Sequence, residues 1–256
     1  MRTVGATRYV QPLREGGSLP ALIEADDDGL YVLKFRGAGQ GPKALVAELV
    51  AGEIGRLVGL PVPEIVLVDV DPSFGRTEPD GEIRALVRAS AGKNVALDFL
   101  PGALGWEPAL APPPDPVLAA KVVWFDALVT NVDRTAKNPN LLLWHRALQL
   151  VDHGASLYFH HDWPDHLARA RSPFAAIANH VLLPLAGDLE AADAELAPLV
   201  TEDALSTILA HVPHDWLVED TSPDAMRAGY VEHLRTRLQP PRLFVEEAIR
   251  ARAQRI

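Results

Sequence analysis

The chain changes character once along its length, and this change limits the folds open to it. Short apolar runs broken by turn residues precede the proline-rich segment Pro112-Pro113-Pro114-Asp115-Pro116, and longer runs with helical spacing follow it. Proline fixes its own φ and disfavours regular structure, so this segment acts as a connection. We therefore predict an α+β fold with two lobes, a strand-rich lobe over residues 1–97 and a mostly helical lobe over residues 98–256.

The composition narrows the class of partner. The 256 residues carry a formal net charge of −10, which argues against nucleic acid or an acidic membrane as a general partner, because both require a basic surface. The chain has no cysteine, which excludes disulfides, thiolate nucleophiles and cysteine-ligated metals. No apolar run approaches the about 20 residues that span a bilayer, and no signal-peptide core precedes Gly17, so a cytoplasmic location is expected.

The spacing of apolar residues predicts individual elements in each lobe. In the first lobe, three strands form a meander, one helix follows, and two further strands complete an antiparallel sheet. These elements span residues 6–12, 20–25, 30–35, 43–58, 65–70 and 83–88, in that order. In the second lobe, helical spacing is found over residues 117–130, 173–185, 189–199, 201–210, 222–238 and 241–255.

The segment from Asn131 to Gly154 carries the most informative chemical pattern. Asp133 and Asn138 enter a predicted hairpin of two apolar runs within residues 141–151, and Asp152 follows its second arm. Phosphoryl transfer requires a carboxylate that orients the attacking hydroxyl, and oxygen ligands that hold Mg²⁺ against the phosphates. The hairpin presents such groups at one end. Each piece alone is also a common turn sequence, so its meaning depends on the other pieces.

A lysine interrupts the third predicted strand. Lys34 lies in the mostly apolar run Tyr31-Val32-Leu33-Lys34-Phe35, and a buried ammonium without a partner is costly. Glu48 and Glu53 both lie on the predicted helix that follows, and either could supply the partner. We favour Glu48, because it borders small residues that allow the helix to approach the sheet closely. A lysine that protects an edge strand from aggregation is the alternative.

Together these pieces resemble the HipA-like branch of the protein-kinase-like superfamily, which is related to the phosphatidylinositol kinases. The chain presents them in the family's order over residues 6–157. They are Gly16-Gly17-Ser18-Leu19-Pro20, Lys34, Glu48 with Gly59-Leu60-Pro61-Val62-Pro63, Asn131-Val132-Asp133-Arg134 with Asn138, and Asp152-His153-Gly154.

The resemblance implies an ATP- and Mg²⁺-dependent phosphotransferase and a role for each matching residue. Asp133 would be the catalytic base or hydroxyl-positioning residue, and Lys34 would contact the phosphates, oriented by Glu48. Asn138 and Asp152 would be the Mg²⁺ ligands. Gly16, Gly17 and Ser18 would cover the phosphates. Asp98, Phe99 and Leu100 would lie in the hinge beside the adenine.

The same resemblance leaves the acceptor open. HipA-like kinases suggest a protein Ser or Thr hydroxyl, but the chain has neither an Ala-Pro-Glu motif nor a long activation segment of the protein-kinase type. A small-molecule hydroxyl is an alternative acceptor, and nucleotidyl transfer is an alternative reaction. The chain is also too short for the extra N-terminal subdomain of full-length HipA toxins, so a toxin–antitoxin pair is not implied.

Three other interpretations start from different features. Gly37-Ala38-Gly39-Gln40-Gly41 follows a strand and precedes a helix, as a dinucleotide-binding turn does, but the strand–helix alternation of that fold does not continue. A metal-dependent hydrolase would use the cluster His153, His160, His161, Asp162 and His166. A catalytically inactive, kinase-like regulatory module is the third, and the presence of the whole set of charged residues argues against it.

Overall fold

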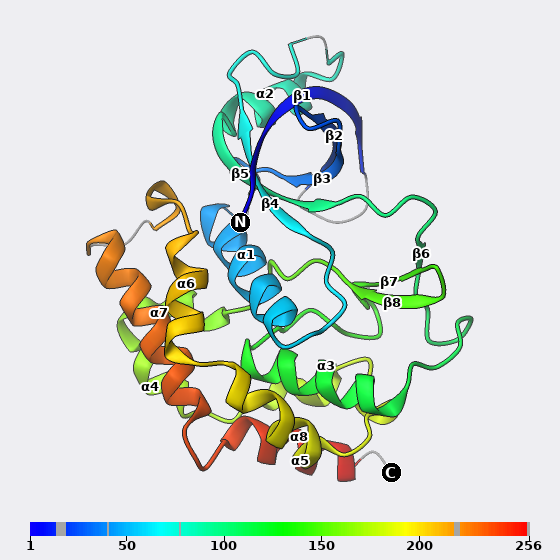
Figure 1. The fold of residues 1–256 in the computed structure, drawn as a ribbon, viewed down its shortest axis with the longest axis vertical. Coiled ribbons are helices and arrows are strands. Elements are labelled where there is room, and N and C mark those ends of the chain that lie inside the picture. The colour runs from blue at the N-terminus through cyan, green and yellow to red at the C-terminus, as the bar shows by residue number, and fades with distance from the viewer. Residues whose placement is uncertain (14–18, 40, 77, 218–220, 255–256) are drawn as a thin grey trace.

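The computed structural model describes residues 1–13, 19–39, 41–76, 78–217 and 221–254. Figure 1 shows two lobes: strands form the N-terminal lobe at the top, and helices form most of the larger C-terminal lobe below it. This arrangement confirms the predicted α+β fold, with strands first and helices second. In the part of the chain that the structure describes, no helix is both long enough and apolar enough to cross a membrane.

Five strands of the N-terminal lobe close into a barrel in the order β1-β2-β3-β5-β4. Their bounds are β1 Thr3–Pro12, β2 Ala21–Ala25, β3 Leu30–Lys34, β4 Ile65–Val70 and β5 Gly92–Asp98. The first three strands form the predicted antiparallel meander, and β1 also pairs in parallel with β4, which closes the barrel. Buried apolar side chains, among them Ile23, Leu33 and Val68, form its core.

Helix α1 (Gly41–Leu57) lies between the barrel and the helices of the C-terminal lobe (Figure 1). It contacts β4 and β5 on one side and α6 (Glu202–Ala210) on the other. Gly52 permits this close packing, because a Cβ atom at that position would lie 2.3 Å from Cδ1 of Ile65. Contacts on both sides of α1 fix its position, and with it the position of the fully buried Glu48.

One predicted strand is a helix. Residues 83–88 lie within α2 (Gly81–Ala89), where the sequence predicted a strand. The carboxylate of Asp80 accepts hydrogen bonds from backbone N–H groups of the first turn, which is a typical helix N-cap. The two buried side chains, Ile83 and Val87, are four positions apart, the spacing of one helical face. The remaining strand of the barrel is instead β5, whose first three residues, Gly92-Lys93-Asn94, carry no apolar side chain.

The C-terminal lobe is arranged around α3 (Pro116–Leu128). Its other helices are α4 His166–Ala170, α5 Leu189–Leu196, α6, α7 Pro223–Leu238 and α8 Leu243–Ala253. Helix α3 packs against α5, α7 and α8 in the larger core of the protein. The predicted helix over residues 173–185 is wrong: this segment forms short 3₁₀ turns, Ala175–Asn179 and Leu183–Leu185, and Pro184 removes a backbone donor that a continuous helix would need.

The predicted hairpin is present and belongs to a small second sheet. The sheet has the order β6-β7-β8, with β6 Leu104–Gly105, β7 Leu141–Trp144 and β8 Ala147–Leu150. Just before and after the two arms, the N–H of Val151 donates to the carbonyl oxygen of Asn140 at 3.1 Å. This pairing places Asn140 and Asp152 at the same end of the hairpin.

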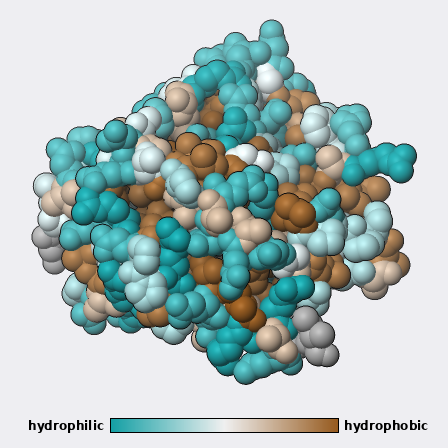
Figure 2. All heavy atoms as spheres, turned by 60° about the horizontal axis from the view of Figure 1, so that its bottom comes forward, coloured by the Kyte–Doolittle hydropathy of each residue, from teal (hydrophilic) through white to brown (hydrophobic). Residues whose placement is uncertain are grey.

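The surface mixes polar and apolar side chains. Figure 2 shows a face that is mostly hydrophilic, with separate apolar patches between the polar side chains. Large apolar side chains that are exposed in the described residues include Leu104, Leu110 and Val117. Scattered exposure of this kind is normal for folded domains and does not by itself indicate a binding site.

Candidate active site

Lys34 connects the two lobes at the candidate active site. Its Nζ lies 2.5 Å from Oε2 of Glu48 and 2.5 Å from Oδ1 of Asp152. Glu48 belongs to α1, whereas Asp152 follows the hairpin strand β8. The Lys34 side chain is only 12% exposed and that of Glu48 is fully buried, so water and salt screen their contact weakly. The alternative partner Glu53 lies instead 3.3 Å from Arg56 on the same helix.

The charges at this junction control one another's ionisation. Burial alone would lower the pKa of Lys34, but the carboxylates of Glu48 and Asp152 outweigh burial and raise it. Burial raises the pKa of Glu48, and the Lys34 ammonium offsets only part of this effect. Burial also acts to raise the pKa of Asp152, but the Lys34 ammonium dominates and lowers it. The junction therefore holds a charged lysine against an ionised Asp152 at neutral pH.

Asp133 and two asparagines lie at the entrance of the hairpin. Nδ2 of Asn138 donates to Oδ2 of Asp133 at 2.7 Å, and Nδ2 of Asn140 donates to the same oxygen at 3.3 Å. Nδ2 of Asn140 also lies 3.5 Å from the carbonyl oxygen of Asp152. Asn140 thus bridges Asp133 and Asp152, and Asp152 in turn contacts Lys34. Spacing alone selects Asn138 and gives no reason to single out Asn140.

Four residues at or near the candidate active site have left-handed backbone conformations. The φ angles of Thr130, Asn140, Asp152 and Leu157 are 54°, 50°, 57° and 54°. Residues with side chains rarely adopt this left-handed region, and for a β-branched residue such as Thr130 it is a clear outlier. Strain of about 1–3 kcal/mol per residue persists only where the surrounding structure imposes it, and it is typical of functional sites.

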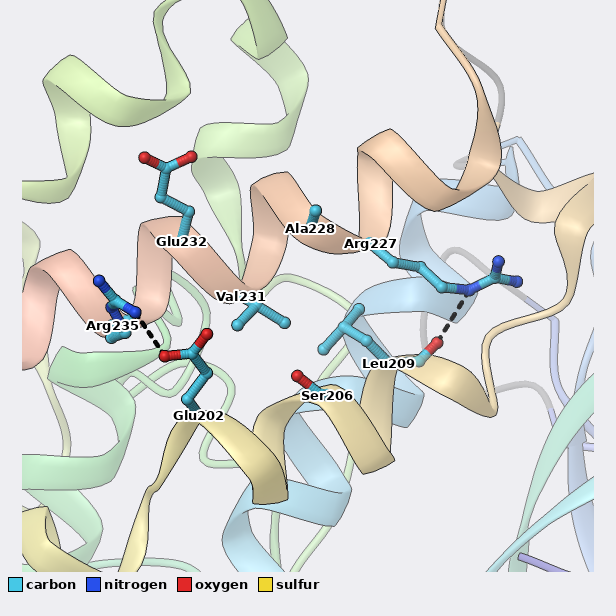
Figure 3. A pocket seen from close by; sticks show the side chains of 8 residues that line it. All are labelled: Glu202, Ser206, Leu209, Arg227, Ala228, Val231, Glu232 and Arg235. Carbon is cyan, nitrogen blue, oxygen red and sulfur yellow. Dashed lines mark hydrogen bonds and ion pairs between the residues drawn. The ribbon is translucent and has the colours of Figure 1, made fainter.

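A small cavity adjoins the contact between Lys34 and Asp152. Its volume is about 20 Å³, room for a water-sized group but not for a nucleotide. Its lining residues are Lys34, Phe35, Ala38, Gly41, Ala44, Leu45, Asp152 and Gly154. A larger surface pocket of about 440 Å³ lies between α6 and α7, where Glu202 and Arg235 form an ion pair (Figure 3). That pocket is separate from the candidate active site.

Six other residues were predicted to contact a nucleotide, and the structure describes three of them. Gly16–Ser18 fall outside the described residues. Asp98–Leu100 run from the end of β5 toward the C-terminal lobe, and the N–H of Phe99 donates to the carbonyl oxygen of Leu30 at 3.0 Å. This hydrogen bond holds the predicted hinge against β3, the strand that ends in Lys34.

The histidine-rich stretch does not assemble into a metal site. Within the described residues, no group of three or more His, Asp or Glu side chains is placed to hold a metal ion. Nδ1 of His160 lies 3.1 Å from the hydroxyl of Tyr230, and the ring of His166 stacks on Trp163. Burial lowers the pKa of His153 and of His160 to about 3, so both rings are neutral parts of the packed interior. The structure gives the metal-hydrolase interpretation no support.

The structure also contains a buried ionic network next to Asp133. Oδ2 of Asp126 on α3 lies 2.5 Å from Nε of Arg134 and 2.8 Å from Nε2 of His180. Burial alone would raise the pKa of Asp126, but Arg134 and His180 hold it well below its usual range. The sequence carries one signal for this network, because Asp126 interrupts the apolar run Val122–Leu128 and a buried carboxylate needs a partner.

Comparisons with known proteins place the chain in a family. A family model described as HipA-like kinase matches residues 7–243. The proinflammatory kinase CtkA from Helicobacter pylori is 14% identical to this chain and superposes with a TM-score of 0.58, over 97% of this chain and 98% of that one. At this level of identity the likeness shows a shared fold. No curated protein sequence gives a significant match. Because the family model covers most of its length, the chain belongs to the HipA-like kinase family.

Proposed function

We propose that the chain is an ATP- and Mg²⁺-dependent phosphotransferase whose site lies where Lys34, Asp133 and Asp152 converge. The observation that carries the proposal is the contact of Lys34 with Asp152 across the two lobes, extended to Asp133 by Asn140. Phosphoryl transfer needs a cation for the phosphates, a carboxylate for the acceptor hydroxyl and oxygen ligands for a metal. The family membership supports this assignment of roles.

In the proposed reaction, Asp133 orients the acceptor hydroxyl for in-line attack on the γ-phosphorus of ATP. A bond forms between the acceptor oxygen and the γ-phosphorus, the bond from that phosphorus to the β,γ-bridging oxygen breaks, and ADP leaves. The acceptor proton passes to Asp133 or to water. Asn138 donates to Oδ2 of Asp133 and so fixes the direction in which the carboxylate faces. Lys34 stabilises negative charge on the phosphates.

The side chains at the hairpin suit Mg²⁺. This ion prefers oxygen ligands and is usually held by one or two carboxylates together with substrate phosphates. Asp152 and the side-chain oxygen of Asn138 would hold it, and the bound ion would neutralise charge on the phosphates. The Asp152 side chain is 46% exposed and contacts Lys34 through Oδ1, so its Oδ2 is the second oxygen available as a ligand.

We propose a protein Ser or Thr hydroxyl as the acceptor, as the family suggests. We also propose that the lobes divide near Leu97, because β5 ends at Asp98 and the predicted hinge begins there. With this division, Lys34 and Glu48 belong to the lobe over residues 1–97, and Asp133, Asn138 and Asp152 belong to the lobe over residues 98–256.

The test is transfer of label from [γ-³²P]ATP, with Mg²⁺, to cellular protein fractions and to metabolite pools. The wild type should label an acceptor, and Asp133→Asn and Asp152→Asn should each lower the rate by about 100-fold or more. Asp162→Asn is the matched control, because Asp162 is a half-buried aspartate that pairs with Arg169. Label from [α-³²P]ATP would instead indicate nucleotidyl transfer, and no labelling from either nucleotide would contradict the proposed function.

A further inference from the structure

Asp126 is a carboxylate in the middle of an apolar helix. Its side chain is fully buried on α3, among neighbours that include Val122, Val123 and Ala127. Burying a charge at such a position is costly unless it is paired and hydrogen-bonded. The contacts that Asp126 makes therefore indicate which parts of the structure depend on this charge.

Three donors from two segments, the loop that holds Asn131 and Arg134 and the turn at His180, converge on this one carboxylate. Oδ1 accepts from Nδ2 of Asn131 at 3.0 Å, and Oδ2 accepts from Nε of Arg134 at 2.5 Å and from Nε2 of His180 at 2.8 Å. Nδ1 of His180 accepts from the N–H of Leu182 at 3.1 Å, so the ring is the neutral tautomer with its proton on Nε2. Burial lowers the pKa of His180, which agrees with this tautomer. Both oxygens of the carboxylate accept hydrogen bonds, and all three donors lie outside α3.

Two of these donors lead directly to the candidate catalytic aspartates. The side-chain oxygen of Asn131 accepts the backbone N–H of Asp133 at 3.0 Å, so Asp126 fixes the backbone of Asp133 through a single intermediate residue. Nη1 of Arg134 donates to the carbonyl oxygen of Asn140 and lies 3.5 Å from that of Val151. Val151 is the residue before Asp152.

The carbonyl oxygen of Asn140 is the point where the two arms of the hairpin meet. It accepts both the N–H of Val151 and the guanidinium of Arg134, which is itself held by Asp126. A carbonyl oxygen has two lone pairs, and both are engaged here. The distance between the catalytic loop at Asp133 and the metal-binding position at Asp152 is therefore set by Arg134, and Arg134 is fixed by Asp126.

We propose that Asp126 is a positioning residue that holds Asp133 and Asp152 in one geometry through Asn131 and Arg134. It does not touch the reacting atoms. The proposal rests on the phosphotransferase function above, and it adds a residue that the catalytic pattern does not contain. A displacement of about 1 Å at a catalytic group can lower a rate by about 100-fold, so a carboxylate that fixes both groups has a large influence on turnover.

Asp193 provides a matched control within the same lobe. Its carboxylate also pairs with an arginine and accepts an aromatic N–H, from Arg242 at 2.7 Å and from Nε1 of Trp124 at 2.8 Å. It differs from Asp126 in having no contact with the catalytic loop or the hairpin among the described residues. The change Asp193→Asn therefore reproduces the loss of a paired carboxylate without disturbing the candidate active site.

The experiment compares steady-state transfer from [γ-³²P]ATP by the wild type, Asp126→Asn and Asp193→Asn, each with a fixed excess of the cellular fraction that the wild type labels. We expect Asp126→Asn to lower kcat by about 10- to 100-fold, as the loss of a residue that orients a metal ligand typically does. The KM for ATP should stay within about threefold of the wild type. Asp193→Asn should lower the melting temperature but keep kcat within about threefold of the wild type. Equal kcat values for the two variants would overturn the proposal.

A second variant covers the case in which Asp126→Asn does not fold. Asn131→Ala keeps the buried ion pair of Asp126 with Arg134 and removes the two hydrogen bonds through Asn131, one to Oδ1 of Asp126 and one from the N–H of Asp133. It should lower kcat by at least about tenfold with a small change in melting temperature, and a kcat within about threefold of the wild type would overturn the proposal.

Hydrogen exchange separates failure of this proposal from failure of the proposed function. If the wild type transfers no phosphate, the function fails, but exchange of the backbone amides at residues 131–140 and 150–153 can still be measured. The backbone amides of both segments should exchange faster in Asp126→Asn than in Asp193→Asn. In Asn131→Ala, faster exchange than in Asp193→Asn is expected at residues 131–135. Equal exchange in these segments would overturn the positioning role whatever the activity.

Discussion

Nζ of Lys34 lies 2.5 Å from Oδ1 of Asp152, although the two residues are 118 positions apart in the chain. The same ammonium contacts the fully buried Glu48, so one cation serves two carboxylates. A metal ion at Asp152 would weaken the contact, because the ion and the Lys34 ammonium are attracted by the same carboxylate. Phosphates at Lys34 would also weaken it, because they attract the same ammonium. The adjoining cavity of about 20 Å³ is also too small for a nucleotide. We therefore expect Lys34 and Asp152 to separate when Mg·ATP binds.

The substitution Lys34→Met tests the role of the lysine in phosphate binding. Loss of the ammonium should lower transfer by about 100-fold or more and should lower stability, because it leaves Glu48 buried without its cation. Lys93→Met is the control, since Lys93 lies on the neighbouring strand β5 and pairs with the exposed Asp69. Transfer rates should be measured below the melting temperature of each variant. Similar rates for both variants would argue that Lys34 is a structural lysine only.

Glu48 and Glu53 are candidate partners on one helix, and isosteric changes distinguish them. Glu48→Gln removes the negative charge that holds Lys34, and we expect a fall in transfer of about 10- to 100-fold. Glu53→Gln breaks only a contact with Arg56, which lies outside the site, and should leave the rate unchanged. Rate measurements at several ATP concentrations should show the loss mainly in turnover. The reverse order of effects would exclude Glu48 as the residue that orients Lys34.

The buried His233 side chain should make the folded protein less stable in acid. Its Nδ1 donates to the carbonyl oxygen of His166 at 2.6 Å, and burial lowers its pKa from 6.5 to about 3. Because the folded pKa is below the unfolded value, the unfolded state binds the extra proton. The stabilising contribution is therefore complete above pH 6.5 and falls by up to about 1.4 kcal/mol per pH unit as the pH drops from 6.5 toward 3.

The variant His233→Asn tests whether His233 causes this fall in unfolding free energy at low pH. An asparagine amide can take the place of Nδ1 in the hydrogen bond but does not titrate in this range. Urea unfolding between pH 7 and pH 4.5 should show a slope of unfolding free energy against pH that is smaller in the variant by about one proton. The residual slope would come from other buried histidines, such as His153 and His160. An unchanged slope would show that His233 does not stay neutral in the folded protein.

Local patterns in the sequence predict most of the fold. They fail where the spacing of apolar residues does not distinguish a strand from a helix, or where a strand begins without apolar residues. The hairpin and α1 have clear periodicity, and the structure contains both. Residues 83–88 fit either a strand or a helix, and the N-cap at Asp80 decides for a helix. The strand β5 begins with Gly92-Lys93-Asn94, which has no apolar side chain, so its strand conformation comes from pairing with β3 and β4 rather than from its own composition.

The candidate site is predictable in part, because its residues are recognisable by type and order. Lys34, Asp133, Asn138 and Asp152 follow from motif order, whereas their mutual distances come only from the fold. Asn140 has no such motif, and its bridging place depends on the backbone at the hairpin entrance. The partners of Asp126 could not be read from the sequence either, because His180 lies 54 positions away from it.

Thermal unfolding with and without Mg·ATP tests most directly whether Lys34 and Asp152 belong to one nucleotide site. At a ligand concentration 100 times Kd, binding to the native state should stabilise the wild type by about 2.7 kcal/mol, a rise of several degrees in Tm. The account predicts this rise for the wild type and for Asp162→Asn, and its loss in Lys34→Met and Asp152→Asn. A wild type whose Tm does not change, or an equal rise in all four proteins, would contradict it.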